Sequence, residues 1–188
     1  MKEIRTLVFA DLHNYPKDNI QQDLKQEYDI IFLLGDISDF YLKLISNYAI
    51  ENNIPICGIV GNHDKWNSLS NNDIVDVHMK NIDYCDILIG GFSGCPLYKE
   101  DKSSPQFTQL QAMALLSCYE YVDIFLAHNS PFGINENSDN GFEGILNYIQ
   151  ENNPKYVLHG HQHINQETII GNTKIIGIFG SKLLTLEI

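Results

Sequence analysis

Short apolar runs alternate along this chain with amphipathic and polar stretches. The apolar runs are rich in β-branched and aromatic residues, which predicts buried strands. Five of them are well marked, at residues 4–10, 29–34, 54–60, 122–127 and 155–159. Because strands and amphipathic stretches take turns, the pattern favours an α/β fold with a largely parallel sheet.

Apolar residues at helical spacing predict four helices between the strands. Ser38 is a suitable N-cap for the second helix, and Pro105 suits the first turn of the third. The predicted helices span residues 16–27, 39–51, 105–118 and 142–152.

The remaining segments have weaker patterns. Residues 66–73 and 129–141 are polar and predict loops, and residues 83–94 predict one or two short strands around Gly90 and Gly91. Residues 166–188 alternate like a β-meander, with turns at Gly171 and near Gly180. No repeat or linker divides the sequence, so we expect one domain over residues 1–188.

Composition limits the class of protein. The hydrophobic fraction is 44%, and no apolar run approaches the roughly 20 residues that cross a bilayer. The four-residue apolar run near the N-terminus predicts a first strand and not a signal peptide. Four widely spaced cysteines form no C-x-x-C pair, which favours reduced thiols in the cytoplasm.

The charge balance limits the classes of partner that the protein is expected to bind. Twelve basic residues against 24 acidic ones give a formal net charge of −12. Such a surface repels phosphate backbones, which disfavours a nucleic-acid partner. The lack of a long apolar run predicts no membrane partner. The oligomeric state is left open by the sequence.

Polar, metal-competent side chains follow the predicted strands. Each cluster comes directly after an apolar run or its closing glycine, in the order A-D-L-H, L-G-D, G-N-H-D, A-H and G-H-Q-H. In open α/β sheets, sites form at the carboxyl ends of the strands, so one cavity could collect them all. The residues concerned are Asp11, His13, Asp36, Asn62, His63, Asp64, His128, His161 and His163.

These ligand types predict a dinuclear centre for divalent ions. Carboxylate, imidazole and amide donors without thiolate suit Mn, Fe, Zn, Co or Ni. The number of donors is too high for one ion and right for two, an arrangement that holds the attacking and leaving oxygens of a phosphate group.

The ordered motifs resemble the calcineurin-like metallophosphoesterase superfamily over nearly the whole chain. The resemblance implies a β-sandwich of two mixed sheets flanked by helices, in four α/β/β/α layers. It implies two divalent ions, manganese first among the candidates, and attack of a metal-bound hydroxide on phosphorus.

The resemblance also assigns roles residue by residue. Asp36 would bridge the two ions, His63 would protonate the leaving oxygen, and Asp64 would orient His63. The first ion would be held by Asp11, His13, Asp36 and His163, and the second by Asp36, Asn62, His128 and His161.

The resemblance implies a small phosphate ester as substrate, with diesters first and monoesters also open. The segment from Gly35 lacks the G-D-x-x-D-R-G motif of the protein phosphatases in this superfamily, which disfavours a protein substrate. Two alternatives remain: a nucleotide phosphatase or pyrophosphohydrolase of the same fold, and a binding scaffold like the retromer subunit of this family. The second would lack the histidine of G-N-H, whereas His63 is present.

Three further residues have ordinary explanations. His159 is expected to pack in its strand or to support a ligand, and His78 is expected at the surface. Asp39 either supports the site or supplies a negative charge at a helix N-terminus. We expect residues 129–141, which follow His128, to select the substrate.

Overall fold

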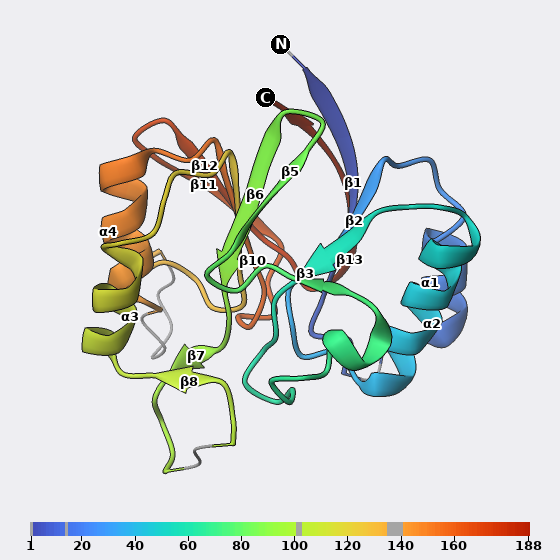
Figure 1. Cartoon of the computed structure of the whole chain (residues 1–188), viewed down its shortest axis with the longest axis horizontal. Helices are drawn as coiled ribbons and strands as arrows, with labels where there is room; N and C mark the ends of the chain where they lie inside the picture. The colour runs from blue at the N-terminus through green and yellow to red at the C-terminus, as the bar shows by residue number, and fades with distance from the viewer. Residues whose placement is uncertain (1, 14, 101–102, 135–140) are drawn as a thin grey trace.

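Two mixed β-sheets pack face to face in the computed structural model, which describes residues 2–13, 15–100, 103–134 and 141–188 (Figure 1). The first sheet has the order β13-β1-β2-β3-β4, in which β13 is antiparallel to β1 and the other neighbours are parallel. Its strands are β1 (Glu3–Ala10), β2 (Ile30–Leu33), β3 (Ile56–Gly58), β4 (Val75–Asp76) and β13 (Gly180–Glu187).

The second sheet has the order β11-β12-β10-β9-β6-β5. Its central strands run parallel, and the edge strands β5 and β11 are antiparallel to their neighbours. Its strands are β5 (Asn81–Tyr84), β6 (Ile87–Phe92), β9 (Ile124–Ala127), β10 (Tyr156–His159), β11 (Gln166–Ile170) and β12 (Thr173–Gly177).

Helices cover the outer face of each sheet. In Figure 1, α1 and α2 lie on one flank of the sandwich and α3 and α4 on the other, which confirms the predicted four layers. These helices are α1 (Lys17–Asp23), α2 (Asp39–Glu51), α3 (Gln109–Leu116) and α4 (Glu143–Asn152). The short elements η1 (Ser70–Asn72), β7 (Cys95–Pro96) and β8 (Gln106–Phe107) lie in the loops at the lower end.

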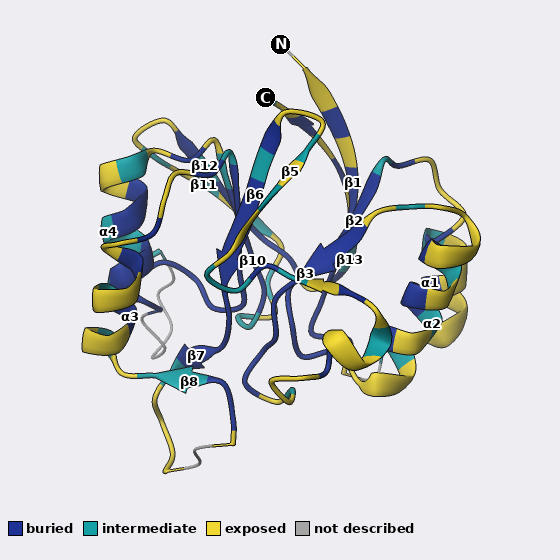
Figure 2. Ribbon diagram, in the orientation of Figure 1, coloured by how far each residue is buried: buried dark blue, intermediate teal, exposed yellow. Residues whose placement is uncertain are grey.

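Alternation along the strands builds this layering. Val8 and Phe32 face the second sheet and join the core between the sheets. Their neighbours Leu7, Ile31 and Leu33 face the other way and pack under the first pair of helices. Side chains of a strand alternate between its two faces, so an unbroken apolar run supplies two cores at once. Figure 2 shows the result as dark, buried strands between helices with exposed outer faces (Figure 2).

Several predicted elements have different bounds. The first helix, predicted over residues 16–27, ends at Asp23. The third helix begins at Gln109, since Thr108 is its N-cap and forms a capping box with Gln111. The two residues after Pro105, Gln106 and Phe107, instead form β8. The hairpin predicted around Gly90 and Gly91 turns at Cys85 and Asp86, both of which have positive φ angles.

The predicted meander is wrong for the last strand. Strands β11 and β12 form the expected hairpin around Gly171, but β13 leaves that sheet and pairs with β1. The crossing at Ile178 and Phe179 ties the two sheets together. Alternation could not reveal this, because a strand at the edge of either sheet has the same pattern. Within the described residues, no helix has the length and hydropathy to cross a membrane.

Removal of a large side chain between the sheets tests this layering. Phe32 is fully buried there. Phe32→Ala should lower the free energy of unfolding by about 3–5 kcal/mol, because transfer and cavity costs add. Phe40→Ala is the matched control at a 59% exposed position and should change it by less than about 0.5 kcal/mol. Equal midpoints for both variants in urea unfolding would contradict the packing described.

Candidate metal centre

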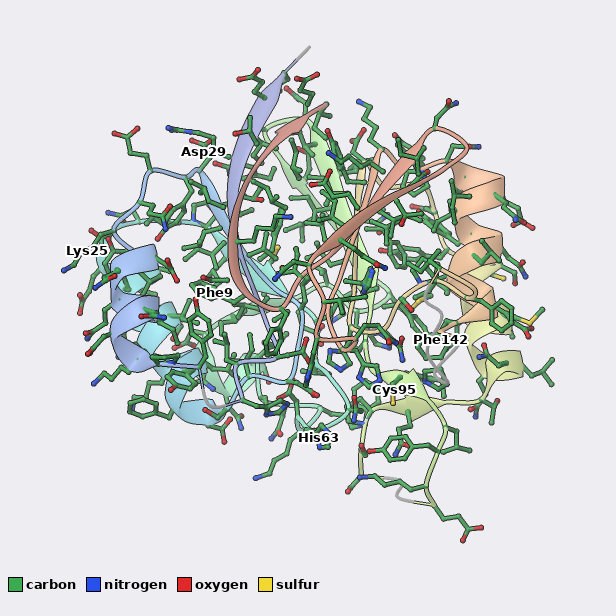
Figure 3. The ribbon with its side chains drawn as sticks, turned by 180° about the vertical axis from the view of Figure 1, so that it is seen from behind. Phe9, Lys25, Asp29, His63, Cys95 and Phe142 are labelled. Atoms are coloured by element: carbon green, nitrogen blue, oxygen red, sulfur yellow. The ribbon has the colours of Figure 1, made fainter. Side chains whose placement is uncertain are left out.

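The carboxyl ends of five strands meet at one end of the sandwich. Asp11 follows β1, Asp36 follows β2, Asn62 follows β3, His128 follows β9 and His161 follows β10. The two sheets thus each contribute ligands, which is why residues far apart in the sequence come together. In Figure 3, His63 lies at the lower edge of the molecule, where these loops converge (Figure 3).

Asp36 lies at the centre of the cluster. Its Oδ2 atom is 3.5 Å from His13 Nε2 and 3.4 Å from His128 Nε2. Its Oδ1 atom accepts a hydrogen bond of 2.8 Å from the backbone N–H of His63. Burial opposes ionisation of Asp36, but the attraction of His128 and the hydrogen bond from the His63 backbone outweigh it and lower the pKa of Asp36.

Asp11 is the second buried carboxylate. Its Oδ2 atom accepts a hydrogen bond of 2.7 Å from the backbone N–H of His161. Its Oδ1 atom is buried, has no hydrogen-bond partner among the described residues, and lies 3.5 Å from His163 Nε2. Burial raises the pKa of Asp11, since a charge there is poorly solvated.

Two groups of ligand atoms result. In each, all the atoms lie within 4.8 Å of one another. One group is Asp11, His13 and His163, and the other is Asp36, His128 and His161. Asn62 adjoins the second group, since its Oδ1 atom is 3.0 Å from His128 Nε2. All seven predicted ligands are thus brought together, and Asp36 reaches towards both groups.

The fully buried His128 fixes the orientation of the second group. Its Nδ1 atom lies 2.8 Å from the carbonyl oxygen of Leu34, so Nε2 points to Asp36 and Asn62. Such a backbone contact holds the tautomer of a metal ligand. Burial acts against protonation, but Asp36 and Asp11 raise the pKa of His128 to about 9. This position therefore strongly attracts positive charge.

The backbone around the ligands is unusual. Asp11, Asp36, His161 and His163 all have φ angles between 51° and 64°, in the left-handed region that non-glycine residues rarely adopt. Conformations of this kind cluster at functional sites, where the surrounding structure holds them.

A neighbouring glycine makes close approach possible at two of these turns. A Cβ atom on Gly61 would lie 2.1 Å from Asp36 Oδ1, and one on Gly160 would lie 2.6 Å from Asp11 Oδ2. The glycines of G-N-H-D and G-H-Q-H are therefore required by packing against the carboxylates.

The donor set fits divalent ions. In the part of the chain that the structure describes, no donor reaches Oδ1 of Asp11, and an ion would fit between this atom and His163 Nε2. Nitrogen and oxygen atoms about 3.5 Å apart are too distant for a hydrogen bond, but suit two ligands each about 2.1 Å from a common ion. The residues of both groups would hold the ions.

His63 stands apart from both groups. Its side chain is exposed, and its ring centroid lies 5.6 Å from that of His13 in an edge-on arrangement. It lines a cavity of about 800 Å³ together with Asn62 and His161. A histidine beside the ligands and facing open space can exchange protons with a bound molecule.

Asp64 makes contacts different from those expected. Its carboxylate accepts hydrogen bonds from the backbone N–H groups of Asp36 at 2.7 Å, Ile37 at 3.1 Å and Gly61 at 2.8 Å. Among the described residues no hydrogen bond joins it to His63. The turn that begins at Gly61 directs this carboxylate inwards, so Asp64 clamps the two ligand loops together. Burial raises the pKa of Asp64 to about 6, partly opposed by these N–H donors.

Three contacts to ligands were not foreseen from the sequence. Asn62 Nδ2 donates to the hydroxyl of Tyr98 at 3.3 Å, and the hydroxyl of Ser104 donates to the backbone carbonyl of Asn62. The ring of Phe179 stacks on His163 with centroids 4.7 Å apart. The apolar run Pro96-Leu97-Tyr98, directly before Lys99 and Glu100, is the sequence signal that could have found the first contact, whereas nothing in the sequence marks the other two.

The remaining polar residues are placed as follows. His159 is buried in β10 outside both groups, and burial lowers its pKa to about 4. Asp39 is exposed at the first turn of α2, as expected for a helix N-terminal charge. His78 was expected at the surface and is instead partly buried, where it accepts a hydrogen bond from the backbone of Ser93. His78 lies beyond the end of β4 and forms an isolated β-bridge with Gly91, so the inside–outside alternation of the preceding residues does not extend to it.

The loop assigned to substrate selection is described in part. Residues 129–134 and 141 are placed, and residues 135–140 lie outside the described residues. Phe132 and Gly141 both line the cavity beside His63. The selective role of this loop stays a prediction.

Sequence comparison identifies the family. The family model described as "Calcineurin-like phosphoesterase superfamily domain" matches residues 4–178. The chain belongs to this superfamily. No curated protein sequence matches the chain.

Solved structures share the phosphoesterase fold at low sequence identity. TT1561 of Thermus thermophilus is 16% identical, with a TM-score of 0.72 over 98% of each chain. Phosphopantetheinyl hydrolase of Mycobacterium tuberculosis is 10% identical, with a TM-score of 0.64 over 94% of this chain and 89% of that one. Vps29 of Entamoeba histolytica, solved in complex with zinc, is 11% identical, with a TM-score of 0.53 over 94% and 74%.

Replacement of Asp36 tests the shared ligand. Asp36→Asn should abolish binding of both ions, because it removes the charge that both groups approach. His13→Ala should weaken mainly one ion. Elemental analysis of purified variants measures this, with Asp39→Asn as a control that removes an exposed carboxylate three residues away. His159→Asn should also keep its ions. Two ions bound to Asp36→Asn would refute the shared role.

Replacement of Asp64 tests the clamp. Asp64→Asn exchanges an acceptor oxygen for an N–H donor that faces backbone N–H groups. The free energy of unfolding of the metal-free protein should fall by about 2–3 kcal/mol, and metal affinity should fall with it. Urea unfolding and calorimetric metal titration measure the two effects.

Asp73→Asn is the matched control on an exposed turn, and both quantities should stay close to those of the unsubstituted protein. If Asp64→Asn alters only the rates with poor leaving groups, the carboxylate orients His63 and does not clamp the loops.

Proposed function

We propose that this chain is a phosphodiesterase that uses two divalent ions to hydrolyse small phosphate esters. One observation carries the proposal. The two groups of carboxylate and imidazole ligands meet at Asp36, next to a cavity of about 800 Å³ that His63 also lines. This volume is in the range of small-molecule sites. The phosphoesterase family membership supports the reaction class.

Two ions held by the seven ligands would lower the pKa of water and neutralise charge on the phosphate oxygens. The protein residues supply the rest. Asp36 holds the two groups together, and His128 is fixed by the Leu34 carbonyl. The buried ligands Asp11, Asp36 and His128 are already held in place and need little reorganisation during the reaction, which lowers its barrier.

His63 is the general acid of this proposal. It belongs to neither ligand group, it is exposed, and it faces the cavity. An imidazolium there can donate its proton to the departing ester oxygen, which otherwise leaves as an unstable alkoxide.

The substrate we propose is a small molecule. The net charge of −12 opposes approach of polyanions, so nucleic acids are disfavoured. For the same reason a diester, with one negative charge, is favoured over a monoester. Oxygen and nitrogen donors without thiolate fit divalent Mn, Fe, Zn, Co or Ni, and manganese is the ion that we propose first. A cytoplasmic location and the absence of a membrane partner remain predictions from the sequence.

Two related functions are less well supported. A nucleotide phosphatase or pyrophosphohydrolase would act on substrates of higher charge, which the acidic surface disfavours. A non-catalytic scaffold does not require seven convergent ligands with an exposed histidine beside them. Chelated protein with Mn²⁺ restored should hydrolyse bis-p-nitrophenyl phosphate faster than p-nitrophenyl phosphate, and the reverse order would indicate a monoesterase.

His63→Ala tests the general acid. The variant should keep both ions, since His63 is in neither group, and lose roughly 10²–10⁴-fold in rate on diesters with alkoxide leaving groups. The loss should be much smaller with p-nitrophenolate, which departs without a proton. Rates over a series of leaving groups, with metal content measured in parallel, check both points.

An equal loss for all leaving groups, with both ions retained, would contradict this role. His63 would then orient the phosphate or tune the nucleophile. Lys65→Ala, two residues away and also exposed, is the control for nonspecific changes in this loop.

A further inference from the structure

The cavity beside His63 has an apolar wall. Its described lining includes Pro96, Leu97, Tyr98 and Phe132. Leu97 is 52% exposed and Tyr98 is 58% exposed, although both are large hydrophobic residues. Apolar side chains that stay in water at the mouth of a reaction centre are typical of a surface that packs against a ligand.

Contacts with β8 hold this wall in place. The backbone N–H of Leu97 donates to the carbonyl oxygen of Phe107 at 2.9 Å, and the backbone N–H of Tyr98 donates to Gln106 Oε1 at 3.2 Å. The hydroxyl of Tyr98 accepts from Asn62 Nδ2. In Figure 3, Cys95, at the start of this segment, lies between His63 and Phe142. The wall is therefore preformed, which reduces the entropy cost of binding.

The cavity also contains a carboxylate. Glu143 lies at the first position of α4, and its backbone N–H donates to Gln109 Oε1 at 3.0 Å. Gln109 Nε2 in turn donates to the carbonyl of Gly141 at 2.8 Å, so the Gln109 amide is occupied at both ends. The partly buried carboxylate of Glu143 has no hydrogen bond or ion pair with any described residue. The described lining residues include no lysine or arginine.

We propose that this cavity binds the leaving alcohol of the substrate, and that this alcohol has an apolar body that ends in a protonated amine. The proposal rests on the proposed function, because His63 lines the cavity and would protonate the oxygen that departs into it. The apolar body packs against Leu97 and Tyr98, and the ammonium group pairs with Glu143.

Electrostatics favour such a zwitterionic diester. Its phosphate carries one negative charge to the metal centre, and its ammonium group cancels that charge for the approach to a protein of net charge −12. A partly buried carboxylate gains most from a charged hydrogen-bond donor. An anionic leaving group would be repelled by Glu143, and the described lining residues include no lysine or arginine to offset that repulsion.

A competition assay with Mn²⁺-loaded protein tests the proposal. The substrates are methyl phosphodiesters of para-aminomethylbenzyl, benzyl, para-carboxybenzyl and ethyl alcohols, mixed and followed by mass spectrometry. Ratios of kcat/KM from one mixture do not depend on metal loading or on the active fraction. The unsubstituted protein should prefer the aminomethyl substrate to the carboxy substrate by at least about tenfold, the worth of a charged hydrogen bond.

Three variants assign the preference to residues. Glu143→Gln should reduce the preference for the aminomethyl substrate by about tenfold. Leu97→Ala should reduce the ratio of benzyl to ethyl turnover and leave the charge preference in place. Glu151→Gln is the matched control, since it removes an exposed carboxylate from the other end of α4 and should change neither ratio. Unchanged ratios in both Glu143→Gln and Leu97→Ala would overturn the proposal.

A binding measurement separates this proposal from the proposed function. Metal-free protein should bind para-aminomethylbenzyl alcohol, as followed by NMR shift changes, and bind it about tenfold more weakly in Glu143→Gln. If no diester is hydrolysed but this binding difference is found, the proposed reaction fails and the site assignment stands. Equal binding by both proteins, or no binding, would overturn the site assignment.

Discussion

Two buried carboxylates need compensation where the two sheets meet. Asp11 and Asp36 are 1% and 3% exposed, and each lies at the carboxyl end of a strand in the first sheet. A carboxylate removed from water costs several kcal/mol unless cations or hydrogen-bond donors surround it. Here the donors are backbone N–H groups of His63 and His161, together with imidazoles from both sheets. The loops at this end of the sandwich are arranged so that these donors reach the two carboxylates.

The ligand side chains converge only because the backbone adopts strained conformations at several positions. Asp11, Asp36, His161 and His163 adopt left-handed φ angles, and Gly61 and Gly160 lie so close to the carboxylates that a side chain would not fit. Asp64 holds the loops together through three backbone N–H groups. The exposed His63 and the ligands Asn62 and His161 line one cavity, which leaves room for a substrate.

Much of this could be predicted from local pattern. Apolar runs followed by Asp, Asn or His place ligands at strand ends, and a β-α-β-α-β opening gives a parallel sheet, so the seven ligand positions could be named. The long-range features could not. Pairing of β13 with β1 depends on which sheet has a free edge, and the inward turn of Asp64 depends on a loop 28 residues away. The burial of His78 depends on a bridge to Gly91 that no local pattern encodes.

The central claim is that two divalent ions share Asp36. Anomalous diffraction from crystals soaked in Mn²⁺ measures this directly. The account predicts two peaks about 3.5–4 Å apart, with Asp36 Oδ2 between them, Asp11, His13 and His163 on one side, and Asn62, His128 and His161 on the other. A single peak, or two peaks of which only one contacts Asp36, would contradict it.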